Sequence, residues 1–418
     1  MLLLLVHVFF CMLLLRRMKW FRQFDLPFYV WPLILLIKVL VGFFMAQYYM
    51  DRYQGGDMHA YLHDAAAFQG LYQSSPLDFW KIVSGCYTEG ESFRGFFTGL
   101  KIWFDSGFGD SFNDARTVVR FHAVLGLVSG QNEWVHLLWS NFLSMVGVVA
   151  LIHFAAGGKV QKSWLPLLVF FIPNVLIWSS LILKESLLLF ALGGSLVCFS
   201  RFREEISVRN AMVFSFFLIC FLLVKTFWLM LLLPAFAYGL LERKENQKVV
   251  GLLITYLAIA VFVLILGTIF PLFDVPEQLY AQQRNMWKFA VYMHAGSLME
   301  PVGFAPSPWS LIRHFPDAFY KGCMTPLPSG QPGLFVAMLV AENFLLPFLL
   351  VRYLLRRKQV LFQPVYPIVV CILLGVGIVL ISAFTTPVLG NLIRYRMPGM
   401  LCLILSLVLV NASRPQSK

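Results

Sequence analysis

The chain has 418 residues, of which 59% are hydrophobic and 13% are charged, and its formal net charge is +12. So few charges among so many apolar residues exclude an ordinary soluble domain and indicate an integral membrane protein. The positive charge would suggest nucleic-acid binding in a soluble chain, but here the basic residues stand in short clusters between apolar runs, where they set orientation in the membrane. We therefore expect a lipid bilayer as partner and no nucleic acid.

The first apolar run covers residues 1–15 and ends at Arg16 and Arg17. No basic region precedes it and no small-residue cleavage site follows it, so it differs from a signal peptide. The charges behind it predict a first span with its N-terminus outside. A second span, near residues 28–49, contains Lys38.

A cluster of ionisable residues follows this second span directly, in the stretch from Gly56-Asp57 to His63-Asp64. A carboxylate at a membrane boundary loses contact with water, so Asp57 is a functional-site hypothesis. His59 and His63 are four residues apart and would share one face of a helix. Three roles stay open for them: zinc binding with Asp57 or Asp64 as a third ligand, contact with a substrate, or interfacial packing.

Nine further apolar runs predict spans, which gives about eleven in an all-α polytopic protein. They lie near residues 133–156, 164–181, 186–200, 210–224, 227–241, 249–271, 334–351, 361–384 and 397–411. The short runs between 186 and 241 also fit paired re-entrant helices, so nine to eleven crossings remain open.

The positive charges give these spans one orientation. More than half of the 33 lysines and arginines fall in short segments that alternation places in the cytoplasm, including the C-terminal tail. Two long segments, 51–132 and 272–333, then lie outside. The first mixes aromatic residues such as Trp80 and Trp103 with charges, and the second contains Trp287, Trp309 and many prolines, as is typical of interfacial helices and loops. We predict a single transmembrane domain over residues 1–418.

The seven cysteines show no metal-binding spacing, and only Cys86 and Cys323 are candidates for an outer disulfide, which no pattern supports. The chain also has no Gly-rich phosphate loop and no Gly-x-Ser-x-Gly element. Because the predicted cytoplasmic loops are short, we expect no nucleotide-sugar donor.

With this topology, the ionisable residues beside the apolar spans, apart from Lys38, collect at the outer ends. They are Asp57, Lys184, Glu185, Lys225, Arg394 and Arg396. Each alone fits an ordinary boundary residue that reaches water, and Lys184-Glu185 equally fits an ion pair capping a helix turn. Taken together, a carboxylate facing several cations at the outer surface is what an anionic, lipid-linked substrate requires.

The chemistry of that substrate assigns roles to these side chains. The planar fork of arginine holds two phosphate oxygens, so Arg394 and Arg396 are the predicted phosphate contacts, with Lys184 and Lys225 in support. On a helix the two arginines point about 200 degrees apart, so one of them faces the site unless the backbone is extended. Asp57, when partly desolvated, is the predicted base for an acceptor hydroxyl.

Gly56-Asp57, Tyr61 and Ala65 form a Gly-Asp-x-x-x-Tyr-x-x-x-Ala element. It resembles the first-loop acidic motif of polytopic GT-C glycosyltransferases, which use polyprenyl-phosphate sugars. Two other stretches, from Pro173-Asn174 to Lys184-Glu185 and from Arg394 to Pro398, resemble membrane proteins encoded with bacterial surface-polysaccharide genes, O-antigen-polymerase-like proteins among them.

The resemblance implies that Asp57 is the base or a metal-coordinating acid, and that Arg394 and Arg396 contact the donor phosphate. His59, Tyr61 and His63 are further predicted substrate contacts. Many GT-C enzymes carry an Asp-Asp or Glu-Asp pair where this chain has the single Asp57. The sequence therefore leaves open whether a divalent cation, Mg²⁺ or Mn²⁺, takes part.

Three activities compete. The one we predict is transfer of a sugar from a polyprenyl-phosphate-linked donor to a glycan or lipid acceptor, at the outer face of a bacterial inner membrane. The second is a polymerase or ligase that moves a whole oligosaccharide repeat from polyprenyl diphosphate, assisted by Arg284, Arg313 and His314. The third is a flippase or transporter, for which repeated halves and charged, broken helices would be typical. A non-catalytic assembly partner is the remaining alternative.

Overall fold

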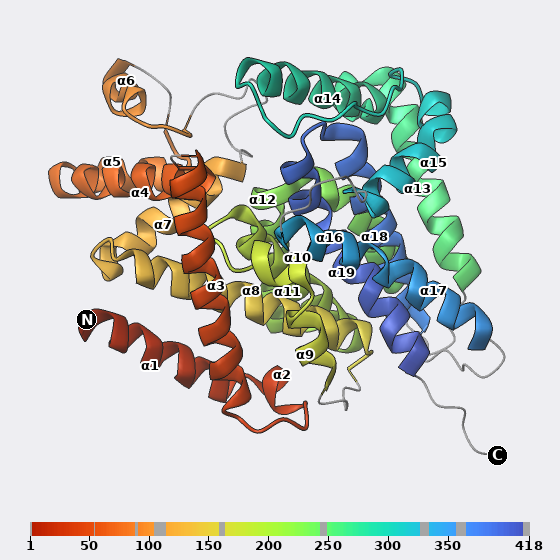
Figure 1. The fold of residues 1–418 in the computed structure, drawn as a ribbon, viewed down its shortest axis with the longest axis horizontal. Helices are drawn as coiled ribbons and strands as arrows, with labels where there is room; N and C mark the ends of the chain where they lie inside the picture. Colours follow the sequence, from red (N-terminus) through yellow and green to blue (C-terminus); the bar gives the residue numbers. More distant parts are fainter. Residues whose placement is uncertain are drawn as a thin grey trace. The chain divides into compact units, whose positions relative to one another are not determined.

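The computed structural model describes residues 2–53, 55–87, 91–103, 114–158, 164–242, 249–326, 334–356 and 365–412 (Figure 1). Within these ranges the regular elements are helices, and the only β pairing is an isolated bridge between Leu298 and Val388. Eight helical segments of the described chain are long and apolar enough to cross a membrane. The prediction of an all-α, multi-pass membrane protein is confirmed at this level.

The candidate spans are mostly single helices, and one is a pair interrupted at Phe344. They are α3 (Val30–Tyr53), α8 (Glu133–Ala155), α11 (Lys184–Glu204), α12 (Val208–Leu241), α13 (Val249–Ile269), the pair α16 (Leu334–Asn343) and α17 (Leu345–Arg356), α18 (Val365–Thr385) and α19 (Leu389–Ala412).

Four predicted spans look different in the structure. The first apolar run forms α1 (Leu2–Arg17), which is shorter than the candidate spans. Residues 164–181 form two short helices, α9 (Trp164–Phe170) and α10 (Pro173–Trp178), because the proline that starts α10 fits a first turn and not a helix interior. The runs 210–224 and 227–241 join into α12, which has a non-helical kink at Lys225.

Contacts group the chain into two compact units, and each unit is described by itself. The single transmembrane domain over residues 1–418 stays a prediction. The first unit comprises residues 1–153, 160–170 and 176–229. Its spans α8 and α11 cross closely at Gly147 and Gly193, where a β-carbon on Gly193 would lie 2.1 Å from the Gly147 carbonyl oxygen. Small residues at such a crossing allow the van der Waals packing that holds helices together in lipid.

The predicted outer segment 51–132 belongs to this first unit, and its described residues are mainly helical. It contains α4 (Asp57–Ser74), α5 (Pro76–Ser84), α6 (Glu91–Thr98) and α7 (Asp114–Ser129). Figure 1 shows α4 and α5 running across the end of α3, and α7 packs against both α4 and α11. Helices in this segment are therefore confirmed, while their placement along the membrane surface stays a prediction.

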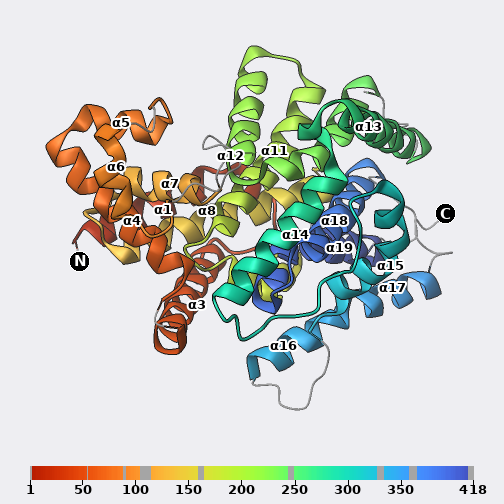
Figure 2. The same ribbon diagram turned by 90° about the horizontal axis from the view of Figure 1, so that it is seen from above.

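The second unit comprises residues 154–159, 171–175 and 230–418. Its central pair, α18 and α19, crosses closely, since a β-carbon on Gly375 would lie 2.8 Å from the Gly399 carbonyl oxygen. The predicted outer segment 272–333 supplies α14 (Val275–Tyr292) and α15 (Pro308–Met324), and both pack on α18 (Figure 2). Cys86 and Cys323, the disulfide candidates, are both free thiols, and Cys323 is buried.

Candidate functional site

The first unit contains a break between two helices that is stabilised by polar side chains. Residues 179–183 join α10 to α11, are buried and are not helical. Backbone groups inside a membrane domain need protein partners because lipid offers none. Lys38 Nζ donates to the Ser179 carbonyl at 2.9 Å, Ser144 Oγ donates to the same carbonyl at 2.7 Å, and Asn141 Nδ2 donates to the Ser180 carbonyl at 2.9 Å. The start of α11 is thereby held in a fixed position.

Helix α3 reaches this break through Lys38 and Gly42, which lie one turn apart. Lys38 is fully buried, and its ammonium group also donates to the Ser179 hydroxyl. A β-carbon on Gly42 would lie only 2.2 Å from the Ser180 carbonyl oxygen. The sequence singled out Lys38 as a charge inside a span. The structure explains this position, because Lys38 donates to the carbonyl and hydroxyl oxygens of Ser179 at the break between α10 and α11.

We expect Gly42→Ala to destabilise the protein by about 1–3 kcal/mol, because the methyl group would push the Ser180 carbonyl away from Asn141. Gly70 in α4 is the matched control, since nothing lies within 4 Å of an added β-carbon there. Gly70→Ala should instead stabilise the protein by about 0.5–1 kcal/mol through helix propensity. Thermal unfolding of the two purified variants measures both shifts. A Gly42→Ala protein as stable as wild type would contradict the close contact.

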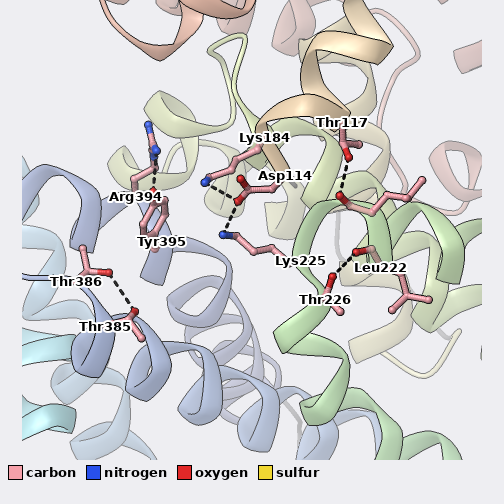
Figure 3. A network of polar contacts seen from close by, with 11 residues as sticks. Asp114, Thr117, Lys184, Leu222, Lys225, Thr226, Thr385, Thr386, Arg394 and Tyr395 are labelled. Atoms are coloured by element: carbon pink, nitrogen blue, oxygen red, sulfur yellow. Dashed lines mark hydrogen bonds and ion pairs between the residues drawn. The ribbon is translucent and has the colours of Figure 1, made fainter. Parts of the chain in front are cut away.

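Three charged side chains meet at the N-terminal end of α11 (Lys184–Glu204). Lys184, its first residue, and Lys225, at the kink of α12, both donate to Oδ2 of Asp114, at 2.7 Å and 2.9 Å (Figure 3). Asp114 is the first residue of α7, and Lys225 has the non-helical angles φ −150° and ψ 77°. All three groups therefore stand where a helix begins or is interrupted.

A second contact fixes α7 against the kink of α12. Thr117 lies one turn after Asp114, and its hydroxyl donates to the Leu223 carbonyl at 2.7 Å (Figure 3). Because a kink leaves helix carbonyls short of backbone donors, this side-chain bond stabilises the interruption. This hydrogen bond fixes α7, which carries Asp114, against α12, which carries Lys225.

The electrostatics of the cluster keep the carboxyl group ionised. Burial alone would raise the pKa of Asp114, but the positive charges of Lys184 and Lys225, and the hydrogen bonds from them, outweigh burial and hold this pKa well below its usual range. The stability that this carboxylate contributes is present above the ordinary aspartate pKa and is lost only as the pH falls through the lowered one. The two cations and one carboxylate together carry one net positive charge, which suits an anionic ligand.

The structure brings together two of the predicted site residues, Lys184 and Lys225, which are far apart in sequence. The carboxylate between them is Asp114, which our sequence reasoning missed. The sequence shows Asp114 only as one acidic residue in a predicted interfacial segment, and other acidic residues in that segment share this feature. The sequence suggested an ion pair between Lys184 and Glu185. In the structure Glu185 is buried in the first turn of α11, and Lys184 forms an ion pair with Asp114 (Figure 3).

The motif after the second span lies on α4, in the same unit. Asp57 is the first residue of α4 and is partly buried, as is His59, whereas Tyr61 is fully buried. The side chain of His63 is 44% exposed, and its Nδ1 lies 3.0 Å from Asp64 Oδ1. Since a helix N-terminus favours negative charge, Asp57 also stabilises α4.

Asp64, one of the two carboxylates considered for a zinc site, has a structural role. It is fully buried, and its carboxylate accepts hydrogen bonds from the backbone N–H groups of Lys101, Ile102 and Trp103 at 2.7–3.2 Å. Over the described part of the chain, no group of three His, Cys, Asp or Glu side chains is placed to hold a metal ion. The zinc alternative for His59 and His63 therefore has no ligand set among these residues.

Arg394 and Arg396 lie on α19, in the second unit. Arg396 is buried, and its guanidinium group donates to the Gly322 carbonyl and, at 2.7 Å, to Asn343 Oδ1. Arg394 donates to the Tyr395 hydroxyl at 3.2 Å (Figure 3). The contacts of Arg396 are thus made with protein groups, which gives it a packing role within its own unit.

The second unit also has a small cavity of about 190 Å³ beside α15. Glu300, Lys321, Thr325 and Thr386 supply its polar lining. The residues proposed to assist a polymerase lie on α14 and α15: Arg284 and Arg313 are exposed, and His314 Nδ1 donates to the Ser310 carbonyl at 2.8 Å.

No protein-family model, no curated protein and no solved structure matches this chain. Its function therefore has to be inferred from its own residues, and the cluster of Asp114, Lys184 and Lys225 is the strongest basis for doing so.

Proposed function

We propose that this protein is an integral membrane glycosyltransferase of the bacterial inner membrane, acting at the outer face. It would move a sugar from a polyprenyl-phosphate-linked donor to a glycan or lipid acceptor. The observation that carries the proposal is the convergence of Lys184 and Lys225 on one oxygen of Asp114, at interruptions of two apolar helices. Partly buried lysines at such a place suit a phosphate group whose lipid tail lies among apolar helices.

The two lysines would bind the donor phosphate and stabilise its departure. As the bond between the anomeric carbon and the phosphate oxygen breaks, the electron pair goes to the phosphate, and preorganised ammonium groups stabilise the charge that develops there. We move the main phosphate-binding role from Arg396 to these lysines, because the guanidinium group of Arg396 is engaged by Gly322 and Asn343. Arg394 remains a predicted contact.

Asp57 would act as the general base. The acceptor hydroxyl attacks the anomeric carbon and gives its proton to a carboxylate, and Asp57 is partly buried at the start of a helix that packs on α7, which carries Asp114. His59, Tyr61 and His63 on the same helix remain predicted substrate contacts. A divalent cation held by Asp57 remains the alternative to direct proton transfer.

A lipid-linked glycan flippase is the second candidate, and a specific observation favours it. Transporters often bind their substrates at discontinuous helices that carry charges. The break before Lys184 and the kink at Lys225 are such discontinuities.

Deleting the gene and analysing the polyprenyl-linked glycans by mass spectrometry tests the proposal. We expect a glycan that lacks one sugar to accumulate, because the transfer step is missing. Single complete repeats would indicate the polymerase, and a complete lipid-linked glycan confined to the inner leaflet would indicate the flippase. Complementation with Asp57→Asn should restore protein but no product, whereas undiminished product would remove Asp57 from the chemistry.

A further inference from the structure

The carboxylate of Asp114 occupies a position that would suit an oxygen of a bound phosphate. Its Oδ2 accepts from two ammonium groups, and the distances of 2.7 Å and 2.9 Å are those of charge-assisted hydrogen bonds. A phosphate oxygen would use the same donors at similar distances.

We infer that Asp114 is an internal counter-ion, which holds the two lysines together until the donor phosphate binds and displaces it. This inference rests on the proposed function of the same site. It makes Asp114 a specificity-determining residue: an anion binds only if it competes successfully with a carboxylate that is already in place.

The counter-ion role follows from the charges. Lys184 and Lys225 both lie within hydrogen-bonding distance of one oxygen, so without a negative group between them their ammonium groups would repel each other. The carboxylate offsets this repulsion and orients both lysines toward one point. A phosphate oxygen could take the place of Asp114 Oδ2 between the two ammonium groups, and the other phosphate oxygens would add further acceptors.

Displacement is possible because Asp114 is the most exposed member of the cluster. Its side chain is 27% exposed, compared with 9% for Lys184 and 19% for Lys225. The helix behind it is held separately, by the hydrogen bond from Thr117 to the Leu223 carbonyl. The carboxylate can therefore rotate toward water while α7 stays in place.

Binding of inorganic pyrophosphate to the full-length protein tests the inference. Calorimetric titration in nanodiscs of phosphatidylcholine, which carries no competing net charge, compares wild type with Asp114→Asn, Lys184→Met and Lys225→Met. Asp114→Asn should bind pyrophosphate about tenfold more tightly, because it removes the competing charge, and each lysine variant should lose binding. Asp78→Asn is the matched control, because it also removes an aspartate paired to a lysine, Lys81, and it should bind as wild type does.

The outcomes separate this inference from the proposed function. If the lysine variants lose binding but Asp114→Asn binds no more tightly than wild type, Asp114 is not displaced and the inference is wrong, while the phosphate site stands. If the lysine variants bind as wild type does, or if no protein binds pyrophosphate, the phosphate site itself is rejected. Asp114→Ser is a second variant of the same kind, and a failure of both variants to fold would also overturn the inference, since the carboxylate would then be indispensable.

Discussion

Replacing Lys225 by methionine should abolish sugar transfer while the protein still folds and inserts. Methionine keeps an unbranched side chain of similar length at the kink of α12 but removes one of the two cations that would stabilise the leaving phosphate. Loss of one preorganised group of this kind lowers the catalytic rate by about 10²–10³-fold. Asp114 keeps its ion pair with Lys184, so the cluster does not retain an unpaired buried carboxylate.

The measurement is the amount of sugar product, determined by mass spectrometry in the deletion strain complemented with each variant and normalised to the protein level in the membrane. Lys81→Met is the matched control: Lys81 is 43% exposed and pairs with Asp78, and such surface pairs contribute only about 0–1 kcal/mol. Its product should equal that of wild type. Full product from Lys225→Met would show that the cluster is structural and would remove the main support for the proposed function.

Apolar runs were sufficient to predict an all-α, multi-pass membrane protein, because hydrophobicity and length decide which segments can cross a membrane. They did not predict how the chain continues where an apolar run is interrupted. The charge of Lys225 marked a break between two runs, but whether the helix ends there or continues through a kink depends on tertiary bonds, such as that from Thr117 to Leu223. Lys184 lay in an expected span boundary, and the structure makes it the first residue of α11.

The carboxylate of the site could not be predicted from spacing. Asp114 is 70 residues from Lys184 and 111 from Lys225, so only the packing of α7 brings the three together. Similarly, the sequence offered both Asp57 and Asp64 as a third zinc ligand and did not distinguish them in that role. The structure does so, because three backbone N–H groups use the carboxylate of Asp64.

Arg396→Met should be the most destabilising of the substitutions considered, because it leaves several buried polar groups without their partner. The Gly322 carbonyl and the Asn343 side chain would lose a donor, and the buried Glu342, which attracts Arg396 electrostatically, would lose a compensating charge. Leaving a buried polar group without its hydrogen-bond partner costs about 1–3 kcal/mol. Glu342 would keep the hydrogen bond from the Asn174 backbone N–H, at 2.7 Å, but would lose the positive charge of Arg396 nearby.

Thermal unfolding of the purified protein measures this effect, with Arg352→Met as the control because Arg352 is exposed on α17. The double variant Arg396→Met/Glu342→Gln should regain part of the lost stability, since removing both charges leaves neither uncompensated. Two explanations of Arg396 are thereby separated. If it packs the second unit, Arg396→Met loses folded protein and the double variant recovers some of it; if it binds the donor phosphate, Arg396→Met folds normally and loses only the product, and the phosphate role would return from Lys184 and Lys225 to this arginine.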